Sequence, residues 1–385
     1  MPANRSSTSV ACIAESQLRF DLQFKPAERA AARRIVPSAT RPARYPSYNA
    51  PPVFPRAARP RTTPVSATRG EWLAAMAKAK DKVAVGVIGL GSMGLGVART
   101  LLSKGFTVYA CDVRPQVVKE LAREGGRACA NPGELGAKAQ VVITLVVNAE
   151  QTAEVLFGGR GAALRMARGS VVIASATVAP AFAEELGARL KAKGIHMIDA
   201  PVSGGAARAA TGQLSIMASG AREAFARAQP VLDAIAAKVY RLGDAPGMGS
   251  KVKMINQLLA GVHIAASAEA MALGIRAGVD PNVLYEVISN SAGASWMFQN
   301  RVPHILAGDY TPLSAVNIFV KDLGIVLDSA RKSTFPLPLT ATAHQIFLMA
   351  GAHGHGQEDD SAVVKVFQAI SGIPLPEKKR APRRR

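Results

Sequence analysis

The feature that most constrains the fold of this chain is a glycine-rich turn, Gly89-Leu-Gly-Ser-Met-Gly94, directly after the apolar run Val83–Ile88. A continuous apolar run is typical of a strand buried on both faces of a parallel sheet. Gly89 permits a tight turn, Gly91 lets the backbone approach a pyrophosphate, and Gly94 lets helix and strand pack closely. A helical pattern follows, whose N-terminus faces the same phosphates. The sequence therefore predicts a dinucleotide-binding turn.

The next apolar run ends at Asp112, 23 residues after Gly89. A carboxylate at this position accepts hydrogen bonds from adenosine ribose hydroxyls and repels a 2′-phosphate, which favours NAD over NADP. Arg114 works the other way, because it can attract that phosphate. We expect cofactor contacts from Asp112 and from every residue of the turn, namely Gly89, Leu90, Gly91, Ser92, Met93 and Gly94.

Strand and helix patterns alternate along the first half of the body. Strands are expected at 83–88, 106–111, 140–146, 170–174, 195–198, 214–218 and 239–242. This alternation predicts a Rossmann-type α/β fold with a doubly wound parallel sheet. Beyond Gly249 the strand patterns stop, and Ala/Leu/Met-rich helical patterns follow. We therefore expect an NAD-binding domain over 81–246 and an all-helical substrate and oligomerisation domain over 247–376.

The net charge of +20 lies mostly in the two ends of the chain. Residues 1–80 hold 14 Lys/Arg and 4 Asp/Glu, and residues 371–385 hold 6 Lys/Arg and one Glu. The body between them has an ordinary balance of 27 basic and 22 acidic residues. The folded body is therefore not expected to bind nucleic acid. Residues 377–385 are expected to form a solvated basic tail.

Residues 1–80 show no apolar periodicity and are rich in Arg, Ala, Pro and Ser. This composition is typical of an organelle transit peptide, for a mitochondrion or a plastid. A disordered extension, or a start codon chosen too far upstream, remains the alternative, and the protein would then be cytoplasmic. Three widely spaced Cys exclude a disulfide scaffold. No apolar run approaches the roughly 20 residues of a spanning helix, so no membrane association is expected.

The turn, with Gly96 after it, resembles the start of the β-hydroxyacid dehydrogenases, the family that contains 3-hydroxyisobutyrate dehydrogenase. Three more segments follow in the family's order. Asp199-Ala-Pro-Val-Ser-Gly-Gly205 is similar to the substrate loop, Gly247-Met-Gly-Ser-Lys-Val-Lys253 to the segment leading to the catalytic lysine, and Lys321-Asp-Leu to a motif of the helical domain. The resemblance covers about residues 83–372. It implies hydride transfer between a nicotinamide cofactor and a small hydroxy acid.

Within the family, several segments look like the L-threonate dehydrogenase branch, which oxidises C2 of a four-carbon sugar acid with NAD. These are 257–266, 292–298, 309–312 with 318–322, and 358–362. Generic members are expected to have two Asn at positions 256 and 257, whereas this chain has Asn256-Gln257. Gln257 agrees with the threonate branch. A 3-hydroxyisobutyrate dehydrogenase, or a reductase of a small semialdehyde, remains the alternative within the family.

The resemblance assigns proton transfer to Lys253 and substrate binding to Gln257, which share one face of a predicted helix. In the oxidation direction Lys253 acts as a base, so its pKa must fall toward the working pH. Lys251 projects elsewhere around the helix and is expected to be solvated. Ser203, Gly204 and Gly205 supply a hydroxyl and unhindered N–H groups for a carboxylate. Lys321 is expected to place a second positive charge near the cofactor or the acid.

Further cofactor contacts implied by the resemblance are Leu145, Val146, Asn148 and Thr177. The chain departs from the family at Val147, in place of a proline, and at Ala174 and Ala176, in place of Asp and Ser. The pair His353 and His355 lacks the geometry of a known metal site, and hydride transfer needs no metal, so none is expected.

The long apolar faces of the helical domain predict a homodimer or homotetramer. Outside the enzymes, a non-catalytic, chromatin-associated relative is the competing class. The basic ends favour it, whereas the retained Lys253 and the near-neutral body argue against it. An imine reductase of related fold lacks this lysine.

Overall fold

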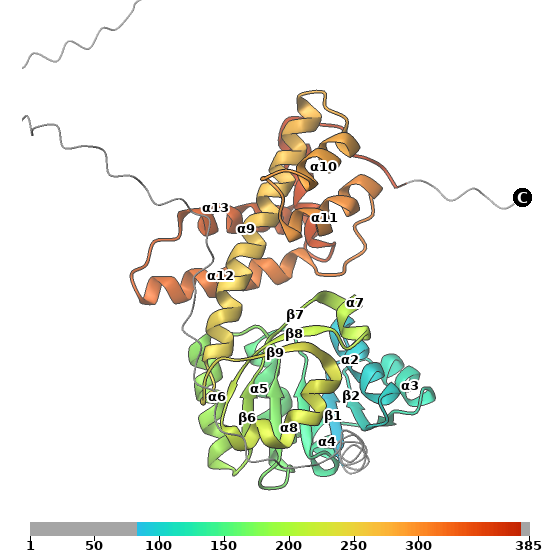
Figure 1. The fold of residues 1–385 in the computed structure, drawn as a ribbon, viewed down its shortest axis with the longest axis vertical. Coiled ribbons are helices and arrows are strands. Elements are labelled where there is room, and N and C mark those ends of the chain that lie inside the picture. The colour runs from blue at the N-terminus through green and yellow to red at the C-terminus, as the bar shows by residue number, and fades with distance from the viewer. Residues whose placement is uncertain (1–82, 379–385) are drawn as a thin grey trace, which may run out of the picture. The chain divides into compact units, whose positions relative to one another are not determined.

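The computed structural model describes residues 83–378. The transit-peptide hypothesis for residues 1–80 and most of the predicted basic tail lie outside these residues. Within them, a sheet covered by helices is followed by a helical domain, as the sequence predicts (Figure 1).

Six strands form the parallel part of the sheet, in the order β3-β2-β1-β4-β5-β6. Their bounds are β1 Ala84–Ile88, β2 Thr107–Cys111, β3 Arg127–Ala128, β4 Val141–Thr144, β5 Val171–Ala174 and β6 His196–Asp199. Ile88, the last residue of β1, pairs with Cys111 on one side and with Thr144 on the other. The carboxyl ends of these strands therefore lie along one edge, where nucleotides bind in sheets of this kind.

The remaining strands depart from the parallel arrangement that the sequence predicts. They are β7 (Val202–Ser203), β8 (Leu214–Gly220) and β9 (Ala236–Arg241). Strand β8 is antiparallel to β6 and β7, and parallel to β9. Only ten residues, including the short helix α7 (Gly205–Ala210), separate β7 from β8. That length is below the dozen or so residues of a parallel crossover, so the chain turns back instead.

Helices cover both faces of the sheet, which makes it doubly wound. The core on one face takes residues from α2 (Ser92–Ser103), α3 (Pro115–Arg123) and α8 (Arg222–Ile235). The core on the other face takes residues from α4 (Pro132–Lys138), α5 (Ala149–Phe157) and α6 (Pro180–Ala192). The short elements β3, α4, β7 and α7 have no counterpart in the sequence prediction, because a few residues carry no measurable period.

The second domain is helical, as predicted, and begins with the long helix α9 (Met248–Arg276). Helices α10 (Pro281–Ser289), α11 (Trp296–Ala307), α12 (Val316–Lys332), α13 (Pro338–Ala350) and α14 (Val364–Ser371) all contact α9. The first turns of α9 also contact the sheet at β6 and β8. One helix thus runs from the sheet into the helical domain (Figure 1).

By length and composition, α9 would also suffice to cross a bilayer, and it is the one described helix of which this is true. Unbroken apolar runs do not reveal this property, because polar residues such as Lys253 and Asn256 interrupt them. Its apolar side chains Ile264, Ala268 and Met271 are buried in the protein interior.

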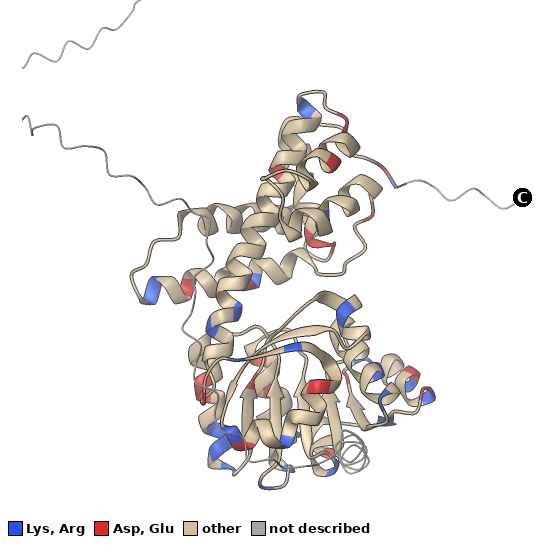
Figure 2. Cartoon of the chain, viewed as in Figure 1, with Lys and Arg blue, Asp and Glu red and all other residues tan. Residues whose placement is uncertain are grey.

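Charged side chains of both signs are interspersed over the two domains (Figure 2). Among the described residues, Arg301 of α11 forms a buried ion pair with Asp360 and binds both of its carboxylate oxygens, with Nη2 at 3.0 Å from Oδ2. Asp360 lies in the single turn Asp360–Val363 before α14. This pair fastens the last segment of the chain to α11.

Candidate active site

The glycine-rich turn has the geometry of a phosphate cradle. Gly89 has a φ of +91°, and a Cβ on Gly94 would lie 1.8 Å from the carbonyl oxygen of Gly89. A Cβ on Gly91 would meet nothing within 4 Å, so the space beside this backbone is open. Gly91 is the N-cap residue of α2, and no side chain caps this helix. N–H groups of its first turn are therefore free to bind an anion. The turn therefore fits a dinucleotide pyrophosphate.

Asp112 directly follows β2 and is tied to the same turn. Its Oδ2 accepts a hydrogen bond from the backbone N–H of Leu90 at 2.6 Å, and its Oδ1 accepts one from Arg114 Nε at 3.0 Å. Burial works to raise the pKa of Asp112, but the hydrogen bonds from Arg114 and Leu90 hold it below its ordinary value. The carboxylate is thus ionised and fixed, as binding of ribose hydroxyls requires.

Two further predicted cofactor segments follow β4 and β5 at the same edge of the sheet. Leu145 donates its N–H to the Ile88 carbonyl at 2.8 Å, and its own carbonyl lies against Gly89. Val146 is partly buried and packs against the core on the face covered by α4, α5 and α6. Asn148 caps α5, since its Oδ1 accepts from Gln151 N at 2.9 Å, so its side chain also has a structural role. Thr177, after β5, is half-buried.

The predicted substrate loop leaves the end of β6. Ser203 is the last residue of β7, and its side chain is half-buried. Gly204 and Gly205 have φ values of +135° and +71°, a left-handed backbone that favours glycine. A Cβ on Gly205 would meet nothing within 4 Å, so this backbone is open to a ligand.

Lys253 is buried on α9, with 7% of its surface exposed. Burial lowers the pKa of Lys253 to about 8; Asp322 works to raise it, and Lys321 lowers it further. A buried lysine of this kind is neutral often enough near neutral pH to accept a proton. Lys251, two residues earlier, is exposed and pairs with Glu184 at 3.0 Å.

Gln257 lies one turn after Lys253 and binds protein groups at both ends of its amide. Its Nε2 donates to Asp322 Oδ2 at 2.6 Å, and its Oε1 accepts from Asn256 Nδ2 at 3.0 Å. Asp322 is 2% exposed. The structure thus places Gln257 beside Lys253 on the buried face of α9, with Asp322 of α12 as its main partner.

Lys321 joins the helical domain to the nucleotide-binding domain. Its Nζ donates to the carbonyl oxygen of Thr177 at 3.0 Å. The same Nζ lies 2.6 Å from Asp322 Oδ1, as an ion pair rather than a directed hydrogen bond. A chain of polar contacts therefore runs from Gln257 through Asp322 and Lys321 to the loop after β5.

Sequence reasoning missed three polar residues at the junction where the start of α9 meets β6 and β8. All three, Asp199, Ser219 and Ser250, are buried, and both hydroxyls donate hydrogen bonds to Asp199. Asp199 heads the recognised substrate loop, which is the only signal that pointed to it. The hydrogen bond between Gln257 and Asp322 was likewise not predicted.

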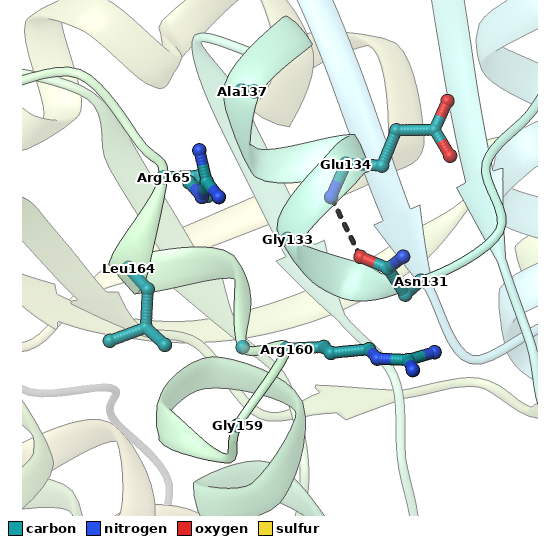
Figure 3. A pocket seen from close by; sticks show the side chains of 9 residues that line it. Asn131, Gly133, Glu134, Ala137, Gly159, Arg160, Leu164 and Arg165 are labelled. Carbon is teal, nitrogen blue, oxygen red and sulfur yellow. Dashed lines mark hydrogen bonds between the residues drawn. The ribbon is translucent and has the colours of Figure 1, made fainter.

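One cavity of the described structure lies away from these residues. It has a volume of about 350 Å³ and is lined by α4, the turn at 162–164 and the loop before that turn (Figure 3). None of its lining residues is a predicted site residue. Over residues 83–378 there is also no group of three or more His, Cys, Asp or Glu that could hold a metal ion.

A nucleotide-binding edge and a buried lysine on the helix that joins the two domains define a nicotinamide-dependent dehydrogenase. Comparison with known proteins specifies the family. The NAD-binding domain of 6-phosphogluconate dehydrogenase matches residues 84–243, and the NAD-binding domain of NADP-dependent 3-hydroxyisobutyrate dehydrogenase matches residues 247–367. The chain belongs to the β-hydroxyacid dehydrogenase family, and it is a hydroxy acid dehydrogenase.

Three relatives illustrate the range of similarity. An L-threonate dehydrogenase of Cupriavidus necator is 67% identical over 294 residues, which are 76% of this chain and 98% of the relative. A mitochondrial 3-hydroxyisobutyrate dehydrogenase of Mus musculus is 34% identical over 75% of this chain and 88% of the relative. A crystal structure of 3-hydroxyisobutyrate dehydrogenase from Salmonella typhimurium is 52% identical, with a TM-score of 0.71 over 74% of this chain and 100% of that chain.

Proposed function

We propose that this enzyme oxidises L-threonate to its 2-oxo acid with NAD, and that Lys253 takes the hydroxyl proton. The observation that carries the chemistry is the burial of Lys253, which lowers its pKa to about 8. The substrate is supported by the 67% identity to a relative named L-threonate dehydrogenase. Gln257, which agrees with the threonate branch, lies beside Lys253 on the same buried face.

The residues of this chain divide the reaction between them. A nicotinamide cofactor held by these residues would supply the acceptor for the hydride of C2 of the acid. Neutral Lys253 accepts the proton of the C2 hydroxyl as the C–O bond becomes a carbonyl, so one hydride and one proton leave the substrate. The open backbone at Ser203–Gly205 is suited to the carboxylate. Asp112 and the glycine-rich turn would hold the adenosine ribose and the pyrophosphate.

NAD is the proposed cofactor because Asp112 presents an ionised carboxylate directly after β2, where an acceptor for the ribose hydroxyls is expected. Arg114 is engaged with Asp112 Oδ1 and with the Leu90 carbonyl, at 3.0 Å in each case. A 2′-phosphate would have to displace Arg114 from these contacts and approach a carboxylate, which opposes NADP.

Oxidation of 3-hydroxyisobutyrate is the second candidate, because the 52% identical Salmonella structure carries that name. The test follows the absorbance of reduced nicotinamide with NAD or NADP and L-threonate, D-erythronate, 3-hydroxyisobutyrate, D-glycerate and L-serine. Preference for L-threonate with NAD supports the proposal. Turnover of 3-hydroxyisobutyrate alone would replace the substrate, and equal use of NADP would overturn the cofactor preference.

We also propose that the enzyme is a homodimer or homotetramer that associates through the helical domain. Within residues 83–378, 14 of the 18 exposed large hydrophobic residues lie at or beyond residue 248. Leu273, Val283 and Val287, from α9 and α10, are more than half exposed. Apolar side chains concentrated on one domain favour a protein interface. Light scattering gives the mass, and a monomer at micromolar concentration would contradict the proposal.

A further inference from the structure

The N-terminus of α9 is capped by the sheet rather than by its own residues. Its N-cap, Gly247, has no side chain, yet three of the first four N–H groups are satisfied. Asp199 Oδ2 accepts from Gly247 N at 2.9 Å and from Ser250 N at 2.8 Å. Ser219 Oγ, on β8, accepts from Gly249 N at 3.0 Å.

The charge and the remaining contacts of Asp199 suit this arrangement. Its Oδ1 accepts the Ser250 hydroxyl at 2.7 Å, and Ser219 Oγ donates to its Oδ2 at 3.4 Å. Two of these partners are backbone N–H groups and two are hydroxyls that point at the carboxylate, an arrangement that favours its ionised, acceptor-only form. Burial raises the pKa of Asp199, and these hydrogen bonds oppose the rise. The positive end of the α9 dipole also favours the anion.

The first turn of α9 packs directly against the backbone of β6 and β8. A Cβ on Gly249 would lie 2.4 Å from the Met217 carbonyl and 2.6 Å from the Asp199 carbonyl. Gly249 therefore allows α9 to touch the backbone of both strands. Rotation or withdrawal of the helix would break the contacts of Asp199 and Ser219.

Lys253 follows Ser250 by three residues, less than one helical turn. The depth and rotation of the first turn of α9 therefore set where the Lys253 side chain lies. Asp199 is also the residue from which the substrate loop 200–205 departs. One buried carboxylate thus connects the helix of the proton-transfer group to the loop suited to the substrate carboxylate.

We propose that Asp199, with Ser219 and Ser250, is a positioning residue that holds Lys253 in register with the substrate loop. Asp199 does not take part in proton transfer itself, because its oxygens are occupied by these donors. The proposal rests on the proposed function, in which Lys253 is the proton acceptor. We call Asp199, Ser219 and Ser250, with their hydrogen bonds to the first turn of α9, the clamp. Weakening the clamp is expected to let water reach Lys253 and so to raise its pKa.

The test compares Asp199→Asn with Asp280→Asn. Asp280 is a matched control, because it caps α10 by accepting from Asn282 N and Val283 N but lies far along the chain from Lys253 and is exposed. Asp199→Asn is expected to lower kcat at least tenfold and to move the lower limb of the kcat/KM profile to higher pH. The Kd for NADH is expected to stay within threefold. Asp280→Asn is expected to leave all three unchanged.

A purely structural cap gives a different pattern. If Asp199→Asn lowers only the melting temperature, and kcat/KM of the folded variant rises over the same pH range as in wild type, the proposal is wrong. Ser250→Ala removes a single side-chain contact and serves if Asp199→Asn does not fold. In this variant too, the rise of kcat/KM is expected to move to higher pH, by a smaller amount than in Asp199→Asn. An unchanged pH dependence would overturn the proposal.

Hydrogen exchange separates the clamp from the proposed function. If the wild-type enzyme does not oxidise L-threonate, the proposed function fails, but the clamp still predicts faster exchange at the amides of 249–253 in Ser250→Ala than in wild type. Unchanged exchange at these amides would contradict the clamp whatever the substrate.

Discussion

Gln257 Nε2 donates a hydrogen bond to Asp322 Oδ2 at 2.6 Å, and this contact joins α9 to α12 inside the site. Both side chains are buried, at 8% and 2% exposure. A glutamine reaches Asp322 where the asparagine expected in generic family members is one methylene shorter. Gln257, which agrees with the threonate branch, is therefore held in place by a buried carboxylate.

The first prediction concerns the length of the side chain at position 257. Gln257→Asn withdraws the amide from Asp322, and a hydrogen bond to a charged group contributes about 1.5–3 kcal/mol. We expect kcat/KM for L-threonate to fall about 10- to 100-fold, with cofactor affinity unchanged. Glu269→Gln, an exposed polar position on the same helix, is the control and is expected to have no effect. Unaltered selectivity between L-threonate and 3-hydroxyisobutyrate in Gln257→Asn would argue against this role.

The second prediction concerns pH. The proposed oxidation needs neutral Lys253, whose pKa is about 8, so kcat/KM is expected to rise with pH and level off above that value. Asp322 raises this pKa and Lys321 lowers it. Asp322→Asn is therefore expected to move the rise of kcat/KM to lower pH, and Lys321→Met is expected to move it to higher pH. Full pH profiles of the three proteins provide the measurement, and shifts of the two variants in the same direction would contradict the assignment.

The third prediction concerns the choice of cofactor. Asp112→Ala removes the ribose acceptor and frees Arg114, which is 56% exposed at its side chain, to meet a 2′-phosphate. We expect KM for NAD to rise about 10- to 100-fold and the preference to move toward NADP. Because Asp112 also binds Leu90 N, the melting temperature is measured in parallel. The double variant with Arg114→Ala is expected to lose the gain with NADP, and a gain that persists would exclude Arg114 as its cause.

The fourth prediction concerns stability. Arg301→Leu leaves the buried Asp360 carboxylate without its partner, which typically costs about 3–5 kcal/mol. Arg331→Leu breaks an exposed pair with Asp328 and is expected to cost about 1 kcal/mol or less. Urea unfolding of the two variants measures the difference. Equal midpoints would show that the buried pair does not stabilise the helical domain.

The sequence predicted those parts of the molecule that local patterns determine. Apolar runs located β1 and β2, and the Gly-rich turn located the start of α2, because period and glycine position are properties of neighbouring residues. The direction of β8 could not be predicted, since it depends on whether the loop after Ser203 crosses over the sheet or turns back. The contacts of Asp199 were also out of reach, because Asp199 and Ser250 are 51 residues apart.

The site shows the same division. Family motifs pointed to Lys253 and Lys321, and the structure gives their surroundings: burial around Lys253, and a contact between Lys321 and the Thr177 carbonyl. Gln257 was expected to bind substrate, and the structure adds a partner, Asp322, that pattern alone does not reveal. Which side chains meet across two domains is decided by packing rather than by spacing.

The most direct test of the account compares Lys253→Ala with Lys251→Ala, measuring NADH binding and L-threonate oxidation in each. Removal of buried Lys253 is expected to abolish oxidation while NADH still binds, because the hydroxyl proton has no acceptor. Removal of exposed Lys251, which only pairs with Glu184, is expected to leave both unchanged. Near-normal oxidation by Lys253→Ala, or its loss in Lys251→Ala, would contradict the assignment of Lys253 as the proton-transfer group.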